Sequence, residues 1–146
     1  MRLYMALDHF DIEDVLGTRL VLEREAARAA PLRRTDEQLL GMDGLLDEMV
    51  AVVGDPTRYI PLDSKFHVVI ALMSGNRLLA HLMGSMRDAI AENLLRSKTD
   101  EALWPSLAGR AQENNHALLQ AVRDQAPDAA AAAVERQMDF YDQLHP

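Results

Sequence analysis

Two residues with metal-binding side chains, Asp63 and His67, lie four positions apart in the sequence. In a helix this spacing places a carboxylate and an imidazole on one face, on neighbouring turns. Such a pair can share one metal ion. The more common role of such a pair is a contact that only satisfies a buried histidine, so the spacing alone leaves both interpretations open.

A third metal-binding side chain, that of His116, lies near the inner face of a predicted later helix. If that helix packs against the one that carries Asp63 and His67, the three side chains converge. Arg19 and Gln137 also fall inside apolar stripes that should face the protein interior. Burying unpaired polar groups costs roughly 1–3 kcal/mol each, and more for charges. We therefore expect these side chains to meet around a polar cavity.

Arg19 interrupts the apolar stripe of the predicted first helix, and its planar guanidinium group suits a carboxylate ligand. An ion pair with Glu23, one turn later, is the alternative. The two roles are compatible, since an acidic neighbour can orient the guanidinium. Asn93 and Arg87, on a later helix, could also line the cavity. Either could equally be a solvated or capping group, and for Arg87 that interpretation is favoured.

The elements that must position these residues are predicted to be helices. Breakers and caps divide the chain into six segments, at about 12–30, 35–54, 61–74, 76–97, 105–125 and 127–144. Thr35 and Gln38 match a capping box, Asn76 can cap the fourth segment, and Pro61 suits a first helical turn. No strand-like alternation persists, and the connections are short. The sequence therefore predicts an antiparallel helical bundle that forms a single domain over 1–146.

The composition of the chain excludes several classes of function. Apolar residues make up 49% of the 146 residues, which is enough for one core. Cysteine is absent, which excludes disulfides, thiolate catalysis and cysteine-based zinc sites. The net charge of −8 makes the chain itself a poor ligand for nucleic acid. The chain contains neither an apolar run long enough to span a bilayer nor a signal peptide, so we expect a cytoplasmic location and no membrane partner.

Five motifs occur in order over nearly the whole chain. They are Arg19-Leu-Val-Leu-Glu23 with its alanine-rich tail to Ala30, Asp63-Ser-Lys-Phe-His67, Ser74-Gly75-Asn76, the segment His116-Ala-Leu-Leu-Gln-Ala-Val122, and the Pro-Asp-Ala-Ala start of the last helix at Pro127. Together they resemble the FCD domain, the FadR-like effector-binding domain of GntR-type transcriptional regulators.

The resemblance implies an all-α bundle of six to seven helices that encloses a central pocket for a ligand and a divalent metal. The metal would be zinc, nickel or manganese. The ligands implied are Asp63, His67 and His116, with Gln137 at a fourth position where many members have histidine. An amide oxygen is a weaker and harder ligand than imidazole. The site would therefore prefer a harder ion, use three protein ligands with solvent, or hold no metal.

The function that the resemblance implies is effector sensing, not catalysis. A small organic acid would contact Arg19, with Asn93 and Arg87 as further candidates, and would modulate DNA binding by an attached winged helix-turn-helix domain. Family members carry that domain ahead of this one, and we expect it to be absent from this chain. We also expect a homodimer. The alternatives are a small metal-dependent enzyme and a helical dimerisation module with a degenerate pocket.

Overall fold

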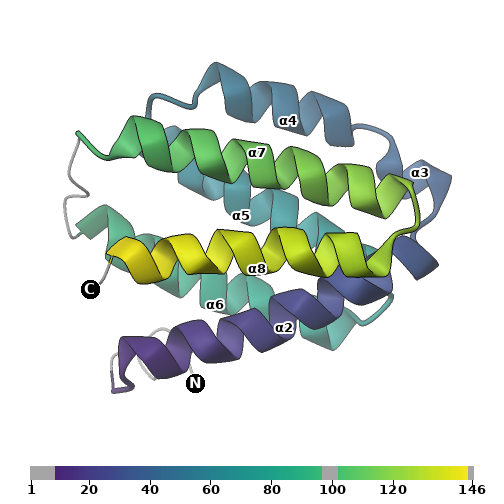
Figure 1. Cartoon of the computed structure of the whole chain (residues 1–146), viewed down its shortest axis with the longest axis horizontal. Helices are drawn as coiled ribbons and strands as arrows, with labels where there is room; N and C mark the ends of the chain where they lie inside the picture. Colours follow the sequence, from purple (N-terminus) through teal and green to yellow (C-terminus); the bar gives the residue numbers. More distant parts are fainter. Residues whose placement is uncertain (1–8, 97–101, 145–146) are drawn as a thin grey trace.

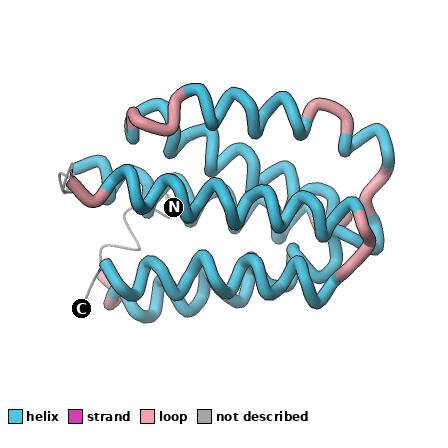
Figure 2. The backbone as a smooth tube through the Cα atoms, turned by 45° about the horizontal axis from the view of Figure 1, so that its top comes forward, coloured by secondary structure: helices cyan, strands magenta, loops and turns pink. Residues whose placement is uncertain are grey.

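The chain folds into helices joined by short turns (Figure 1). The computed structural model describes residues 9–96 and 102–144, apart from the side chains of 93–96 and 139–144. The helices in these ranges are α2 (Ile12–Arg33), α3 (Asp36–Leu39), α4 (Met42–Ala51), α5 (Pro56–Met73), α6 (Arg77–Arg96), α7 (Trp104–Arg123) and α8 (Pro127–Leu144). No strand is present in the described ranges (Figure 2). The predicted all-α fold is confirmed.

The helices form two layers. α2, α8 and α7 lie side by side in the front layer of Figure 1, with α5 and α6 behind them and α4 along one edge. α8 packs against both α2 and α7, while α5 packs against both α6 and α2. The turns that join α5 to α6 and α7 to α8 are short, so each of these pairs is an antiparallel hairpin.

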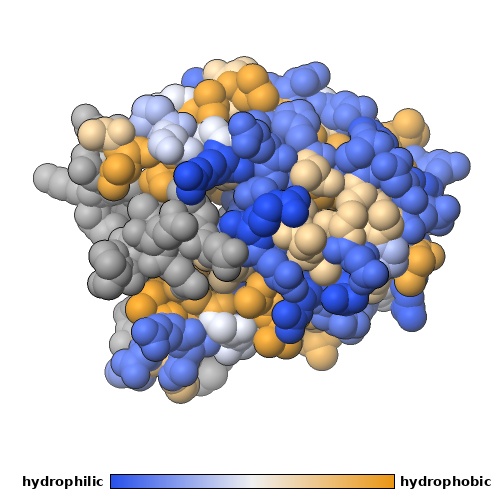
Figure 3. Space-filling model, in the orientation of Figure 1, coloured by the Kyte–Doolittle hydropathy of each residue, from blue (hydrophilic) through white to orange (hydrophobic). Residues whose placement is uncertain are grey.

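The first and last described helices lie against each other. Arg28 and Asp128 form an ion pair of 2.9 Å across this contact, and Arg24 and Glu135 form one of 3.4 Å. Because these side chains are largely exposed, the pairs add little stability. Small side chains contribute more to this contact, because the buried alanines of both helices allow the backbones to approach closely. The alanine-rich start of α8 also forms a pale apolar area on the surface (Figure 3), where Ala129 is exposed.

α2 is longer than predicted because it continues through Pro31 to Arg33. A proline inside a helix removes one backbone hydrogen bond. Here Pro31 lies in the last turn, and the amide of Arg34 still reaches the carbonyl of Ala30 at 2.8 Å. Pro31 and Ala30 are both buried. Burial of this face keeps the last turn helical.

The second predicted segment is two helices. Thr35 and Gln38 form the predicted capping box, with both reciprocal hydrogen bonds present, so this prediction is confirmed. The helix that they begin ends after one turn, at Leu39. Gly41 then takes a left-handed conformation with φ of 82°, which lets the chain change direction before α4.

α5 begins at Pro56, five residues earlier than predicted. Asp55 caps its start by accepting a hydrogen bond of 3.0 Å from the amide of Thr57, and Pro56 occupies the first turn. Pro61 lies within the helix and is exposed. Water can therefore satisfy the backbone carbonyl that Pro61 leaves without a partner. The early start places Asp63 well inside regular helix.

Ser74, Gly75 and Asn76 form the turn between α5 and α6. Ser74 Oγ donates to the carbonyl of Ala71, and Gly75 has a φ of 79°. Asn76 Oδ1 accepts a hydrogen bond of 3.0 Å from the amide of Leu79, as expected of a helix cap. This turn fixes α6 next to α5, where Arg87 can reach across to Asp63.

The main apolar core lies between α4, α5, α7 and α8. Phe66, Met49, Leu118, Val122 and Val134 are all nearly inaccessible there. None of the described helices is long and apolar enough to cross a membrane. The buried charged residues gather elsewhere, where α2, α5 and α6 meet.

Candidate functional site

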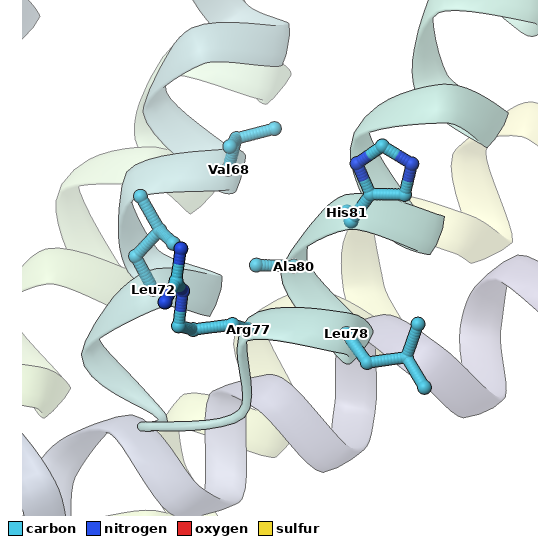
Figure 4. A pocket seen from close by; sticks show the side chains of 6 residues that line it. All are labelled: Val68, Leu72, Arg77, Leu78, Ala80 and His81. Carbon is cyan, nitrogen blue, oxygen red and sulfur yellow. The ribbon is translucent and has the colours of Figure 1, made fainter.

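A surface groove of about 530 Å³ runs along the outer side of α5 and α6 (Figure 4). It is lined by Val68, Leu72, Arg77, Leu78, Ala80 and His81. Arg77 lies beside Leu72 in this view, and both Arg77 and His81 are exposed. Because Arg77 and His81 are both exposed, neither side chain is held in a fixed position from which it could orient a ligand.

A second, much smaller cavity lies within the bundle among α2, α5 and α6. Its volume is about 20 Å³, which is room for about one water molecule. It is lined by Arg19, Ile60, Asp63, Ser64, Arg87, Ile90 and Ala91. Arg19, Asp63 and Arg87 are all buried. Buried charges are rare unless they are paired, so this cavity is the candidate functional site.

Glu23, on α2, is held between two arginines. Its carboxylate accepts a hydrogen bond of 2.8 Å from Nε of Arg19, one turn earlier in the same helix. Arg87, on α6, donates its Nε to one carboxylate oxygen and its Nη2 to the other, the second bond being 2.9 Å long. This two-bond geometry is the strongest that a guanidinium and a carboxylate can form. The ion pair between Arg19 and Glu23, which the sequence offers as the alternative to a role in the cavity, is present, and Arg19 lines the cavity as well.

Asp63, on α5, extends this arrangement to two more helices. Its Oδ2 accepts a hydrogen bond of 3.2 Å from Nη1 of Arg87, and its Oδ1 accepts one of 2.7 Å from Nδ2 of Asn115 on α7. Arg87 therefore bridges the carboxylates of Glu23 and Asp63. With Arg19 included, two positive and two negative side chains meet in one buried cluster, and their charges cancel.

His67 completes the cluster, one turn after Asp63. Its Nε2 lies 2.9 Å from Oδ1 of Asn115. The amide of Asn115 has one favourable orientation, because its NH₂ group donates to Asp63 and its oxygen must then face His67. An amide oxygen only accepts, so Nε2 of His67 carries the hydrogen and donates it. The imidazole nitrogen that faces the cluster therefore has no free lone pair.

The cluster shifts the pKa of two of its members. Burial, followed by the charge of Arg87, lowers the pKa of His67 to about 4, against the opposing effect of Asp63 and Glu23. His67 is therefore neutral near pH 7. Burial alone would raise the pKa of Glu23, but the charges of Arg19 and Arg87 outweigh burial and hold it well below its usual range.

Gln137, on α8, is buried as predicted, with 3% of its surface exposed. Its Nε2 atom is buried and has no hydrogen-bond partner among the described residues. A buried donor without an acceptor is costly, so this position suits a group that brings an oxygen acceptor. Asn93, the other amide predicted to face the cavity, has its side chain outside the described residues.

The predicted position of His116 is wrong. The side chain of His116 is exposed, and its neighbour Asn115 points into the cluster with none of its surface exposed. One residue corresponds to about 100° of rotation around a helix, so the side chain of His116 points well away from the direction in which Asn115 meets the cluster. The spacing of Asn115 from the buried Leu118, Leu119 and Val122 was the sequence signal that places it on the inner face.

The solvated or capping role favoured for Arg87 is also wrong. Arg87 is 3% exposed and contacts carboxylates on two other helices. Its neighbours Met83 and Met86 on α6 are buried too. Arg87 thus lies on the inner face of its helix, and its charge is compatible with burial only because Glu23 and Asp63 reach it from α2 and α5.

A family model, described as the FCD domain, matches residues 14–140. This match covers most of the chain and includes every helix that contributes to the cluster. The chain belongs to the FCD domain family. The resemblance inferred from the motifs is confirmed.

Two relatives of this FCD domain extend the comparison. The HTH-type transcriptional regulator LutR of Bacillus subtilis (strain 168) is 30% identical over 88 residues, which is 60% of this chain and 40% of LutR. A solved structure, Streptococcus agalactiae GntR, has a TM-score of 0.77 at 22% identity and covers 96% of this chain and 64% of that one. The FCD domain chain thus spans less than two thirds of either relative, and the second likeness supports the fold.

The metal site that the family resemblance implies does not fit the residues of this FCD domain. Of the implied ligands, His116 is at the surface. Both oxygens of Asp63 already accept hydrogen bonds, and the near nitrogen of His67 is a donor. The described residues contain no group of three or more histidine, cysteine, aspartate or glutamate side chains that could hold a metal ion. The donor set is that of a hydrogen-bonded cluster.

Proposed function

We propose that this FCD domain senses a small organic acid in the cavity beside Arg19 and Arg87. The observation that carries the proposal is the position of Glu23, whose carboxylate already lies between these two arginines. The pair thus has the geometry of a carboxylate-binding site, filled by a side chain of the protein itself. Gln137, on α8, is a buried donor without a partner among the described residues, which suits a ligand oxygen if the rearranged pocket extends to it.

The cavity is too small for an organic acid, so binding requires a rearrangement. A ligand carboxylate would compete with Asp63 for Arg87, whose bond to Asp63 is the longest in the cluster at 3.2 Å. Since Arg87 also holds Glu23 on α2, the exchange would change how α2 sits against α5 and α6. Such a ligand acts only by binding one arrangement more tightly than the other.

We propose that the domain acts within a GntR-type transcriptional regulator, where this shift alters DNA binding by an attached winged helix-turn-helix domain. LutR is named as an HTH-type transcriptional regulator, and this chain spans 40% of its length. A homodimer is part of the proposal because two-fold symmetric operators favour it. The dimer is tested by light scattering of the purified chain.

The proposal is tested by measuring binding of carboxylates to the purified chain by calorimetry. The panel contains monocarboxylates, hydroxy acids, sugar acids and dicarboxylates. Arg19→Lys, which keeps the charge but loses the planar fork, should weaken binding about tenfold to a hundredfold. Arg77→Lys, at the exposed groove, is the matched control and should bind as the wild type does.

The small volume of the cavity favours a second candidate, a helical dimerisation module with a closed pocket. This function predicts a dimer with no saturable binding of any acid in the panel. Saturable binding that is weakened by Arg19→Lys but not by Arg77→Lys supports the sensor. A dimer that binds none of the acids contradicts it.

A further inference from the structure

The buried cluster around Asp63 places a cationic side chain where the family resemblance implies a metal ion. We infer that the Arg87 guanidinium takes the place of the divalent metal in this pocket, so that the pocket is assembled without one. This inference concerns the cation of the resting protein, and it holds whichever acid, if any, the pocket binds.

Both carboxylate oxygens of Asp63 already accept hydrogen bonds from side chains of the cluster. A carboxylate binds a metal through a lone pair on one of its oxygens. In this chain Oδ2 receives Nη1 of Arg87 and Oδ1 receives Nδ2 of Asn115, at 3.2 and 2.7 Å. A metal ion at either oxygen would have to fit beside that donor and would lie close to the positive charge of Arg87.

The charges within the buried cluster are already balanced. Arg19 and Arg87 balance Glu23 and Asp63 within one buried cluster. A divalent ion added to this cluster would leave two uncompensated positive charges in an environment where charges are poorly solvated. If Arg87 were absent, the same two carboxylates would need another cation. The guanidinium and the metal are therefore alternatives for one electrostatic role.

The other side chains that would serve as metal ligands are amides. The face of α7 that meets Asp63 and His67 presents Asn115. The family resemblance gives Gln137, which is buried on α8, as the fourth ligand, so amides stand where imidazoles would serve a metal. Amide oxygens bind zinc and nickel weakly. Asn115 already contacts both residues, because its oxygen accepts from His67 while its nitrogen donates to Asp63.

The deciding measurement is the metal content and thermal stability of the wild-type chain, expressed with zinc, nickel and manganese in the medium. Mass spectrometry should find far less than one metal ion per chain. Neither a chelator nor added metal should move the melting temperature. Near-stoichiometric metal that is lost in Asp63→Asn would overturn the inference, and this result needs no other variant to fold.

A comparison of two designed variants tests the role of Arg87 directly. The double variant Asn115→His, Gln137→His supplies two imidazoles but keeps Arg87. The triple variant adds Arg87→Met, which keeps a long apolar side chain and removes the charge. Zinc or nickel should raise the melting temperature of the triple variant far more than that of the double variant. Equal responses would show that Arg87 and a metal do not compete for this position.

Discussion

Oδ1 of Asn115 lies 2.9 Å from Nε2 of His67, so an amide on α7 accepts the only hydrogen that the buried imidazole offers on that side. The other end of the same amide donates to Asp63, which in turn accepts from Arg87. Asn115 is therefore the link through which α7 joins the cluster, although its side chain carries no charge.

Removing this link should destabilise the domain. Asn115→Ala leaves a buried carboxylate oxygen and a buried imidazole N–H without partners, and each such group costs about 1–3 kcal/mol. We expect the free energy of unfolding to fall by about 2–4 kcal/mol in urea denaturation. His116→Ala, next in sequence but exposed, should change it by about 0.5 kcal/mol or less. Similar effects of the two substitutions would contradict the helix orientation described above.

Glu23 and Arg87 should be energetically coupled. Arg87→Met leaves two buried carboxylates short of a cation, and breaking a buried pair from one side costs about 3–5 kcal/mol. Glu23→Gln should be destabilising for the converse reason. In the double variant the losses should not add, and the coupling energy should exceed about 1 kcal/mol. Urea denaturation of the four proteins measures it, and additive losses would show that the ion pair contributes nothing specific.

Stability should decrease as the pH is lowered through the range in which His67 titrates. The pKa of His67 is about 4 in the folded chain, against an ordinary value of 6.5. Between these values the unfolded state binds more protons, so the free energy of unfolding falls as the pH falls from about 6.5 to about 4. Glu23, whose folded pKa is lowered, acts in the same direction but only below its ordinary value of 4.5.

The measurement is urea denaturation between about pH 7 and about pH 5, where Glu23 does not yet contribute. His67→Gln removes the titrating group and should flatten the dependence over this range. His116→Gln, which replaces an exposed histidine outside the cluster, is the matched control. A wild-type slope that survives in His67→Gln would assign the pH dependence to another group.

Two glycines should respond in opposite ways to replacement by alanine. Gly75 has a φ of 79°, and a non-glycine residue in this region costs about 1–2 kcal/mol, so Gly75→Ala should be destabilising by about that amount. Gly17 lies inside α2, and a Cβ atom there meets nothing within 4 Å. Gly17→Ala should therefore stabilise the domain by about 0.5–1 kcal/mol. Differential scanning calorimetry reports both, and a neutral Gly75→Ala would contradict the turn conformation.

The sequence predicts the helices well because their signals are local. The capping box at Thr35, the Asn76 cap and the helix start at Pro127 depend on neighbouring residues, and all three are present. The boundaries differ from the prediction at Pro31 and Pro61, which lie inside helices, and at Gly41, where the second predicted segment divides into two helices. Pro31 remains helical because its face of α2 is buried. Pro61 remains helical because it is exposed, so that water can satisfy the backbone carbonyl that lacks a donor.

The site is less predictable because it depends on how each helix is rotated. Asp63, His67 and Arg19 could be identified because a polar residue interrupts an apolar stripe within a single helix. The prediction selects His116, which lies one residue away from Asn115 on the inner face of α7. The burial of Arg87 depends on carboxylates of α2 and α5, and the sequence of α6 alone does not predict that these carboxylates reach it.

The pairing of α2 with α8 also affects the order in which parts of the chain can fold during synthesis. Contacts between these helices join residues that are 100 and 111 positions apart, so α2 leaves the ribosome long before its main partner exists. Contacts of such sequence separation form late and slow the folding of a helical chain. Until α8 is translated, the alanine face of α2 lacks the helix that covers it in the folded domain.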